Sequence, residues 1–305
     1  MILKANWITN QDGSIYHLHL LPEQIAPLII TVGDPSRVAL ISDLLDTIEC
    51  KISSREFVCH TGRLGTKRIS ILSTGIGTDN IDIVLNEIDA LFNVNLLSGK
   101  PKEKITSCTI IRLGTSGAIQ EDIPMNSLLI TEWSIGTDAL MNYYQHEEYL
   151  VLEEVRTAFK TAGLESLNFH LSCCDAALLD HFKGNDFLVG NTLTAPGFYG
   201  PQGRTTRIPN SVPDLIDKLK NVHFKNIGRL TNIEMETSGI YHLGKGLGHR
   251  CLSVNAILAN RINNSFSEHP EKIIMHMIEK SMSLLENLYH SKLPIFSSHR
   301  CKIKF

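Results

Sequence analysis

One apolar stretch constrains the fold more than any other part of this 305-residue chain. Residues 109–119 read Thr-Ile-Ile-Arg-Leu-Gly-Thr-Ser-Gly-Ala-Ile, and such a run of β-branched residues closed by glycines predicts a buried strand. Arg112 lies within it and stays charged, so it needs an anion, a carboxylate or water as a partner. Ligands of open α/β sheets bind just beyond the carboxyl ends of strands. We therefore predict an anion site at Arg112 and Thr115, with an arginine paired to an internal carboxylate as the alternative.

A second strand, predicted over 28–32, leads into another candidate anion site. Gly33 follows it, and Asp34 with Pro35 is a helix-start signal. Because helix N-termini favour anions, the cation Arg37 in the first turn fits best if an anion shares the site. A solvent-exposed arginine is the alternative.

A third strand, predicted over 68–74, ends in a Gly-x-Gly turn before a helix over 81–91. This order resembles half of a dinucleotide-binding fingerprint. Asn80 stands where the third glycine would be, so we do not expect a nicotinamide cofactor.

The remaining segments alternate between strand and helix patterns, which predicts an α/β fold. We expect one domain over 1–305, a three-layer sandwich whose mixed, mostly parallel central sheet is flanked by helices, with peripheral tails at 1–15 and 294–305. The predicted strands are 54–59, 127–133, 169–174 and 251–259; a hairpin turn is predicted at 61–65, a surface loop at 93–107, and helices at 151–162, from 231 onward and at 274–288.

Composition limits the classes of function. A net charge of -3 argues against a nucleic-acid binder held by bulk electrostatics. No apolar run approaches the ~18 residues of a membrane span. Seven cysteines without a C-x-x-C pair favour a reducing compartment, so we expect a cytoplasmic protein.

The glycine- and proline-rich segment 194–204 predicts a rigid loop that carries recognition groups. Phe198 can stack on a planar ring, and Gln202 and Arg204 can match the donors and acceptors of a heterocyclic base. A plain surface loop is the alternative.

Two further segments carry candidate ligands for a sugar. Glu234 and Glu236 flank Met235, so two carboxylates could hold hydroxyls while the thioether packs on a ring. Ordinary glutamates near a helix N-terminus are the alternative. His17 and His19 form a His-x-His pair with no completing ligands nearby, so we expect no metal there.

Six short segments follow one another in an order that a known family shares. Together they resemble the nucleoside phosphorylase family and, within it, the uridine phosphorylase branch, over most of the chain from about Tyr16 to about Arg261. The segments are 33–37 (Gly-Asp-Pro-Ser-Arg), 54–57 (Ser-Arg-Glu-Phe), 73–77 (Ser-Thr-Gly-Ile-Gly), 112–118 (Arg-Leu-Gly-Thr-Ser-Gly-Ala), 198–204 (Phe-Tyr-Gly-Pro-Gln-Gly-Arg) and 234–236 (Glu-Met-Glu).

The resemblance implies a phosphorolysis reaction, most simply uridine and phosphate giving uracil and ribose 1-phosphate. It implies that phosphate, a co-substrate, is bound by Gly33, Arg37, Arg112 and Thr115, with Arg55 supplied by a neighbouring subunit. A homodimer or a larger homo-oligomer would then be the working form.

The resemblance also implies a site for the nucleoside. Its sugar would be held by Thr115, Met235 and Glu236, with His17 reaching it from the adjacent chain. Its base would be read by Gln202 and Arg204, with Phe198 against its face and Glu234 nearby. Among these groups the catalytic residues would be Arg112, Gln202, Arg204 and Glu236.

Two positions depart from the family pattern. Ile233 stands where an aromatic residue is frequent, and Asn80 stands where some relatives have a monovalent-cation ligand, so no metal and no cofactor are predicted. Asn260 and Arg261 replace the aspartate of the purine branch, which favours a pyrimidine. The competing functions are those of a purine or broad-specificity phosphorylase, of a nucleoside hydrolase, which would not need the three phosphate arginines, and of a non-catalytic nucleoside-binding protein.

Overall fold

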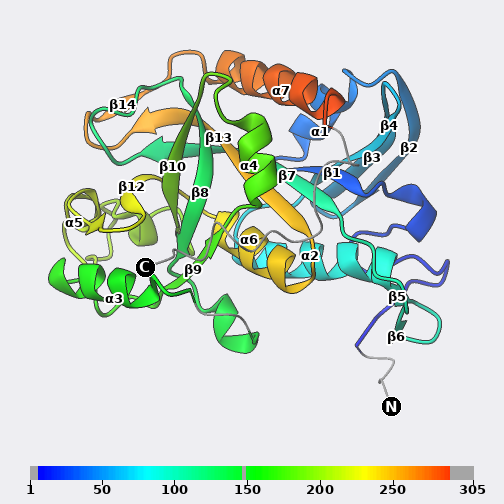
Figure 1. Ribbon diagram of the computed structural model, residues 1–305, viewed down its shortest axis with the longest axis horizontal. Coiled ribbons are helices and arrows are strands. Elements are labelled where there is room, and N and C mark those ends of the chain that lie inside the picture. Colours follow the sequence, from blue (N-terminus) through cyan, green and yellow to red (C-terminus); the bar gives the residue numbers. More distant parts are fainter. Residues whose placement is uncertain (1–5, 146–148, 289–305) are drawn as a thin grey trace. The chain divides into compact units, whose positions relative to one another are not determined.

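The computed structural model describes residues 6–145 and 149–288. The chain divides into two compact units, unit 1 and unit 2. Their helices and strands are labelled in Figure 1. Unit 1 contains the residues up to Arg112 together with Leu243–Cys251, and unit 2 contains Leu113–His242 and the residues from Leu252 onward. The expectation of a single domain stays a prediction, and the tail from 294 lies outside the described residues.

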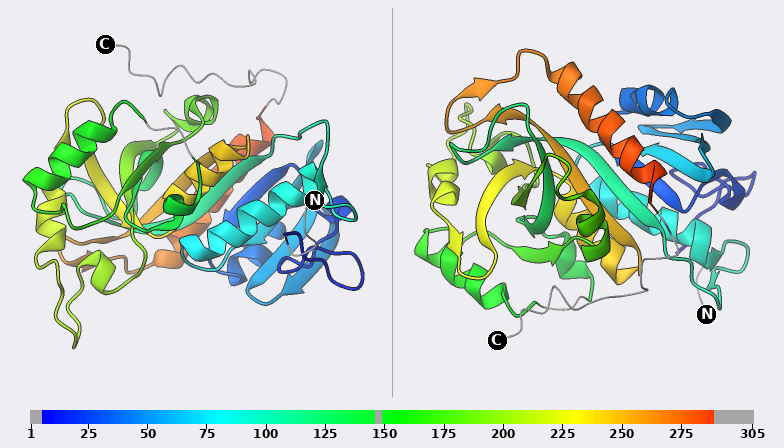
Figure 2. Two further views of the ribbon diagram at one scale, coloured as in Figure 1. Left: turned by 90° about the horizontal axis from the view of Figure 1, so that it is seen from below. Right: turned by 45° about the horizontal axis from the view of Figure 1, so that its top comes forward.

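Unit 1 is organised around strand β1, which has a parallel neighbour on each side. Leu28 of β1 lies opposite Ile69 of β4 and opposite Thr109 of β7. Every residue of β1 is buried, as in other parallel strands covered on both faces. Helix α2 lies along these strands (Figure 2). The elements of unit 1 are η1 (Pro22–Gln24), β1 (Leu28–Val32), α1 (Ser36–Ser42), β2 (Thr47–Ser54), β3 (Phe57–Leu64), β4 (Lys67–Ser73), α2 (Thr78–Asn93), β5 (Val94–Asn95), β6 (Lys100–Pro101) and the start of β7 (Thr109–Ala118).

The hairpin of β2 and β3 corrects the sequence-based expectation. A single strand was expected over 54–59, but the chain turns at Arg55 and Glu56 between β2 and β3. The hairpin turn expected at 61–65 lies slightly later, at Gly65 and Thr66 between β3 and β4, because β3 continues through Leu64. Gly62 marks a close approach instead of a turn, because a Cβ there would lie 2.0 Å from the carbonyl oxygen of Thr47. Arg55 therefore lies at the tip of the hairpin, and its backbone is left-handed, with a φ of 55°.

Unit 2 is organised around strand β10, which pairs in parallel with β8 and β12. Strands β9, β11, β13 and β14 add antiparallel pairs. Helices α3 and α5 contribute Phe159 and Leu219 to one buried cluster, which also contains Ile233 of β12. The elements of unit 2 are the rest of β7, β8 (Leu128–Gly136), η2 (Leu140–Tyr143), α3 (Leu152–Thr161), β9 (His170–Cys173), α4 (Ala176–Phe182), β10 (Phe187–Thr194), η3 (Gly200–Gln202), α5 (Leu215–Lys220), β11 (His223–Phe224), β12 (Gly228–Glu234), the first part of α6 (Thr237–Gly246), most of β13 (Arg250–Asn260), β14 (Ser265–Phe266) and α7 (Pro270–Glu286).

A second correction concerns the segment that begins at residue 231. It was expected to start a helix, but Gly228–Glu234 is strand β12, and the helix α6 starts at Thr237. Thr192 of β10 pairs with Asn232, so a tertiary contact decides this conformation.

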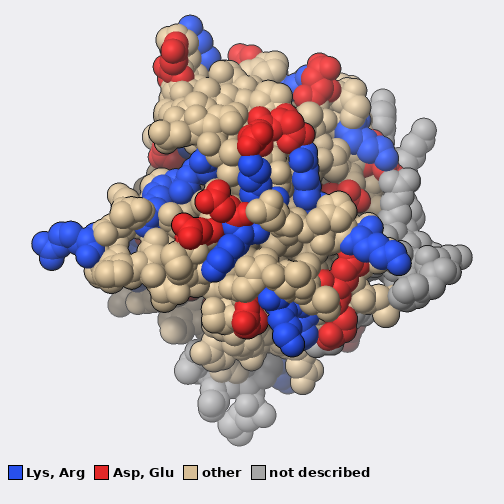
Figure 3. Space-filling view, turned by 90° about the vertical axis from the view of Figure 1, so that its left-hand side faces the viewer, with Lys and Arg blue, Asp and Glu red and all other residues tan. Residues whose placement is uncertain are grey.

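The predicted α/β class is confirmed, with a mixed sheet flanked by helices. The pairs of β1 with β4 and of β10 with β8 are parallel, whereas the pairs of β2 with β3 and of β8 with β9 are antiparallel. On the face shown in Figure 3, acidic and basic side chains are interspersed and form no continuous basic surface. None of the described helices is long and apolar enough to cross a membrane.

The cysteines divide into two kinds. Cys50, Cys59, Cys108, Cys174 and Cys251 are free thiols, and Cys173 is disulfide-bonded. Burial raises the pKa of Cys59 to about 12, so this thiol is protonated and inert near neutral pH.

Candidate active site

The parallel strands of unit 1 bring two predicted phosphate ligands to one sheet edge. Thr31 of β1 pairs with Arg112 of β7, so Arg112 lies level with the carboxyl end of β1, which Gly33 follows. A Cβ on Gly33 would meet the carbonyl oxygen of Gly75, 3.4 Å away, which shows how closely the turns after β1 and β4 approach each other. Arg112 is only 6% exposed. The strand register therefore places a buried arginine level with the end of β1.

Arg37 lies in the first turn of α1, which starts at the same edge. Asp34 Oδ1 accepts a hydrogen bond from the Ser36 backbone N–H at 2.9 Å, and the Arg37 N–H donates to the Asp34 carbonyl at 3.1 Å. Burial works to raise the pKa of Asp34, but the hydrogen bonds from Ser36 and the charge of Arg37 lower it overall. The turn after β1 thus holds an ionised carboxylate that fixes the backbone carrying Arg37.

The two residues expected to serve a neighbouring subunit lie in one cluster of unit 1. The Arg55 guanidinium lies 5.4 Å from the centre of the Tyr16 ring, and the Tyr16 and His17 rings meet edge to face at 4.7 Å. His17 Nδ1 lies 2.6 Å from Oε1 of the buried Glu87. The positions of His17 and Arg55 are therefore linked through their own chain.

Strand β7 carries the predicted site onward into unit 2. Thr115, three positions after Arg112, is half-buried. Its neighbour Ser116 is held in place, since the Asn232 amide donates to its hydroxyl at 2.9 Å. The Ser116 hydroxyl is thus fixed by a side chain of β12.

The predicted base-recognition loop of unit 2, residues 194–204, is held by hydrogen bonds between its own residues. Arg204 Nη1 donates to Gln202 Oε1 at 2.7 Å and also to the carbonyl oxygen of Phe198. The Arg204 guanidinium lies over the Phe198 ring, 3.6 Å from its centre. Gln202 is buried, whereas half of the Phe198 surface is exposed. The structure therefore brings together three of the four residues predicted to contact the base, Phe198, Gln202 and Arg204.

Arg261 belongs to the same cluster, although we did not assign it to the site from the sequence. Its Nη1 donates to the carbonyl oxygen of Gln202 at 3.1 Å, and its side chain passes Gly117. Burial lowers the pKa of Arg204, and the charge of Arg261 lowers it further. Burial also lowers the pKa of Arg261. The sequence shows Arg261 directly after the last predicted strand, but no pattern in it indicates that this arginine lies beside Gln202.

The predicted sugar ligands lie in the turn between β12 and α6. Glu234 is buried and accepts hydrogen bonds from the Thr194 hydroxyl at 2.6 Å and from the backbone N–H groups of Glu236 and Thr237 at 2.9 and 3.0 Å. Its carboxylate thus fixes the turn that presents Met235 and Glu236. Its predicted contact with the base stays a prediction.

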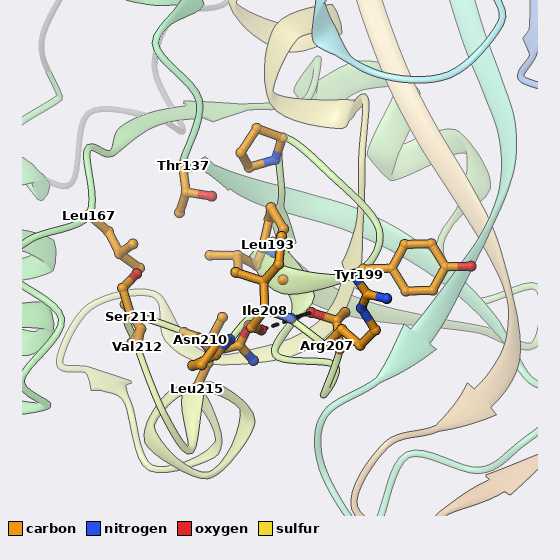
Figure 4. A pocket seen from close by; sticks show the side chains of 15 residues that line it. Thr137, Leu167, Leu193, Tyr199, Arg207, Ile208, Asn210, Ser211, Val212 and Leu215 are labelled. Atoms are coloured by element: carbon orange, nitrogen blue, oxygen red, sulfur yellow. Dashed lines mark hydrogen bonds between the residues drawn. The ribbon is translucent and has the colours of Figure 1, made fainter.

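A cavity of about 730 Å³ adjoins the base-recognition loop. Leu193, Leu167 and Val212 line it, while the Tyr199 ring points away from them (Figure 4). The loop therefore has a largely apolar cavity beside it.

The described residues contain no group of three or more His, Cys, Asp or Glu side chains placed to hold a metal ion. The absence of a metal or cofactor from the reaction stays a prediction.

The two sets of groups define a class of protein. Guanidinium groups at a strand edge bind an anion, and an amide with two further guanidinium groups suits a polar ring with carbonyl oxygens. A carboxylate beside a methionine suits a sugar. An enzyme acting on a nucleoside and an oxyanion fits this combination.

Comparison with known proteins gives the family. Residues 27–288 match the model of the phosphorylase superfamily, and the chain belongs to this family. The uridine phosphorylase of Thermococcus kodakarensis is 29% identical over 278 residues, which cover 90% of this chain and 88% of that protein. The uridine phosphorylase of Haemophilus influenzae is 27% identical over 281 residues, which cover 90% of this chain and 96% of that protein.

Purine-specific relatives and a solved structure complete the comparison. A DeoD-type purine nucleoside phosphorylase of Bacillus subtilis is 27% identical over 245 residues, which cover 78% of this chain and 84% of that protein. A Trypanosoma brucei nucleoside phosphorylase, described as showing uridine phosphorylase activity, superposes with a TM-score of 0.86 at 28% identity and covers 92% of this chain and 100% of its own. The chain is thus a nucleoside phosphorylase, an enzyme of the pentosyltransferase class.

Proposed function

We propose that this enzyme catalyses the phosphorolysis of uridine, giving uracil and ribose 1-phosphate. The observation that carries the proposal is the cluster of Gln202, Arg204 and Arg261, in which one amide and two part-buried guanidinium groups are fixed beside an aromatic ring. Uracil offers two carbonyl oxygens and a ring N–H, which these groups complement. The uridine phosphorylases among the relatives support the same substrate.

The charges of the site suit the reaction. Phosphate attacks C1′ of the ribose while the glycosidic bond breaks, so the sugar gains positive character and the departing uracil gains negative charge. Arg37 and Arg112 would orient the anionic nucleophile, which lowers the entropic cost of the reaction. Arg204 and Gln202 would stabilise the leaving base, an electrostatic contribution of about 3 kcal/mol per well-placed donor.

The sugar would be held from the turn between β12 and α6. Glu236 would accept hydrogen bonds from ribose hydroxyls, and the Met235 thioether would pack on the ring. Because Glu234 accepts backbone hydrogen bonds within this turn, the Glu236 backbone is fixed before substrate binds.

We propose further that two copies of the chain form the smallest active assembly. His17 and Arg55 would act in the site of the neighbouring copy, His17 on the sugar and Arg55 on phosphate. Their placement in one cluster supports this, since a single contact surface would deliver both. The reaction needs no cofactor, and we place it in the cytoplasm.

A purine substrate is the main alternative, and the end of β13 argues against it. Asn260 is buried, its amide donates to the carbonyl oxygens of Gln120 and Ile123, and its Oδ1 accepts from two backbone N–H groups. This side chain is fully used within the fold and cannot donate an acidic proton to a purine.

An assay with uridine, thymidine and inosine, each with and without phosphate, tests the proposal. We expect uracil release from uridine that depends on phosphate. A preference for inosine would favour the purine branch, and cleavage that ignores phosphate would favour a hydrolase. A protein inert towards all three nucleosides would be a binding protein instead.

A further inference from the structure

A buried carboxylate of helix α2 holds the segment that carries His17. Glu87 is 7% exposed. Its oxygens accept hydrogen bonds from the backbone N–H groups of His17, at 3.1 Å, and of Leu18, at 2.8 Å. The His17 ring completes the set, with Nδ1 at 2.6 Å from Oε1. A residue 70 positions away thus fixes both the backbone and the ring of His17.

These contacts determine which ring nitrogen is free to bind a ligand. A carboxylate facing two backbone N–H groups acts as an acceptor, so the hydrogen on the His17 ring belongs to Nδ1. In the neutral ring Nε2 then keeps its lone pair and accepts a hydrogen bond. The His17 side chain is 27% exposed, so part of the ring is open to a ligand, and the Tyr16 ring packs edge-on against it.

We propose that Glu87 is a positioning residue for the reaction. It fixes His17 as the Nδ1–H tautomer, so that Nε2 accepts a hydrogen bond from a ribose hydroxyl of the nucleoside bound by the neighbouring copy. This inference rests on the proposed function. It explains why a carboxylate is buried here, because an amide in its place would point an N–H donor at groups that are themselves donors.

The test is a double-mutant cycle on Glu87 and His17. We expect Glu87→Gln and His17→Ala each to raise the KM for uridine about tenfold, the effect of one lost hydrogen bond, with the KM for phosphate unchanged. Because Glu87 acts through His17, the double variant should be no worse than His17→Ala alone. Effects that multiply in the double variant would overturn the proposal.

Two further variants separate positioning from folding. Glu87→Asp keeps the negative charge, so we expect a smaller rise in the KM for uridine than in Glu87→Gln. This variant still tests the proposal if Glu87→Gln folds poorly. Asp82→Asn removes a charge from the same helix, where Asp82 accepts a hydrogen bond from Asn86, and should leave the uridine KM unchanged. If the KM for uridine rises only in those variants whose melting temperature falls, Glu87 stabilises the fold and does not position His17 for the reaction.

Nuclear magnetic resonance of the ring nitrogens tests the positioning without relying on activity. At a pH where the ring is neutral, the wild type should show His17 protonated on Nδ1, and Glu87→Gln should shift the ring towards the Nε2–H tautomer. If the wild type lacks uridine phosphorolysis, the proposed function fails, and these spectra still decide whether Glu87 positions His17. An unchanged tautomer in Glu87→Gln would contradict the inference.

Discussion

The residues predicted to bind phosphate in unit 1 and those predicted to bind the base in unit 2 are positioned in different ways. Gly33, Arg37 and Arg112 come from separate elements, and the register of parallel strands brings the ends of those elements to one edge. Gln202 and Arg204 come from one short loop and are bonded directly to each other. The phosphate half is thus built by backbone pairing and the base half by side-chain hydrogen bonds. Substitutions in the two halves should fail in different ways.

The largest effect is expected in the phosphate half. Arg112→Ala should lower kcat/KM by about 10²- to 10³-fold, because a preorganised positive charge is lost from a buried site. Arg112→Lys should restore only part of the lost kcat/KM, since an ammonium group cannot bind two phosphate oxygens in the bidentate geometry of a guanidinium. Steady-state kinetics and a melting curve measure both properties. An Arg112→Ala protein that unfolds would mean that this arginine supports the fold.

In the base half, Arg204→Ala should lower kcat/KM for uridine by about 10²-fold through loss of the donor to the leaving base. The KM for phosphate should not change, which separates the two halves. Arg156→Ala is the matched control, because Arg156 is an exposed arginine of helix α3 in the same unit, and it should behave like the wild type. A phosphate KM that rises in Arg204→Ala would show that the halves are not independent.

A smaller effect is expected at the turn that presents Glu236. Glu234→Gln places an amide donor where backbone N–H groups already point, so we expect a loss of about 1 to 3 kcal/mol in the free energy of unfolding. Urea denaturation measures it, with the exposed Glu153→Gln as a control. A stability equal to that of the wild type would show that the turn does not depend on this carboxylate.

The smallest effect concerns the pH dependence of unit 1. His249 Nδ1 accepts a hydrogen bond from the Cys108 N–H at 3.2 Å, and burial lowers the pKa of His249 although Asp89 works against this. The unfolded chain therefore binds this proton more readily than the folded one. The free energy of unfolding should therefore decrease as the pH drops below 6.5, the ordinary pKa of histidine, by at most about 1.4 kcal/mol per pH unit.

Melting temperatures between pH 5 and pH 8 measure this dependence. In His249→Gln the melting temperature should depend less steeply on pH. Part of the dependence should remain, because burial also lowers the pKa of His60. A slope unchanged in His249→Gln would assign the effect to other groups.

The sequence predicted those features that depend on neighbours along the chain. The strand over 28–32, the helix of α2 and the loop over 198–204 each have a continuous pattern, and the structure confirms these elements. The turn at Arg55 was missed because 54–59 was expected to be one strand. Gly62, expected in the next turn, lies within β3 and makes room for the Thr47 carbonyl.

Long-range contacts account for what the sequence could not show. Strand β12 was expected as helix because its pairing with β10 depends on residues about 40 positions away. Arg261 and Glu87 were not assigned to the site, since their partners Gln202 and His17 are far off in the chain. The roles of the predicted site residues stay predictions that the variants above test.

The most direct test of the account is the balance of products formed from uridine and phosphate by the purified enzyme. The account predicts that one ribose 1-phosphate appears, and one inorganic phosphate disappears, for each uracil released. Uracil accompanied by free ribose, with inorganic phosphate unchanged, would contradict it.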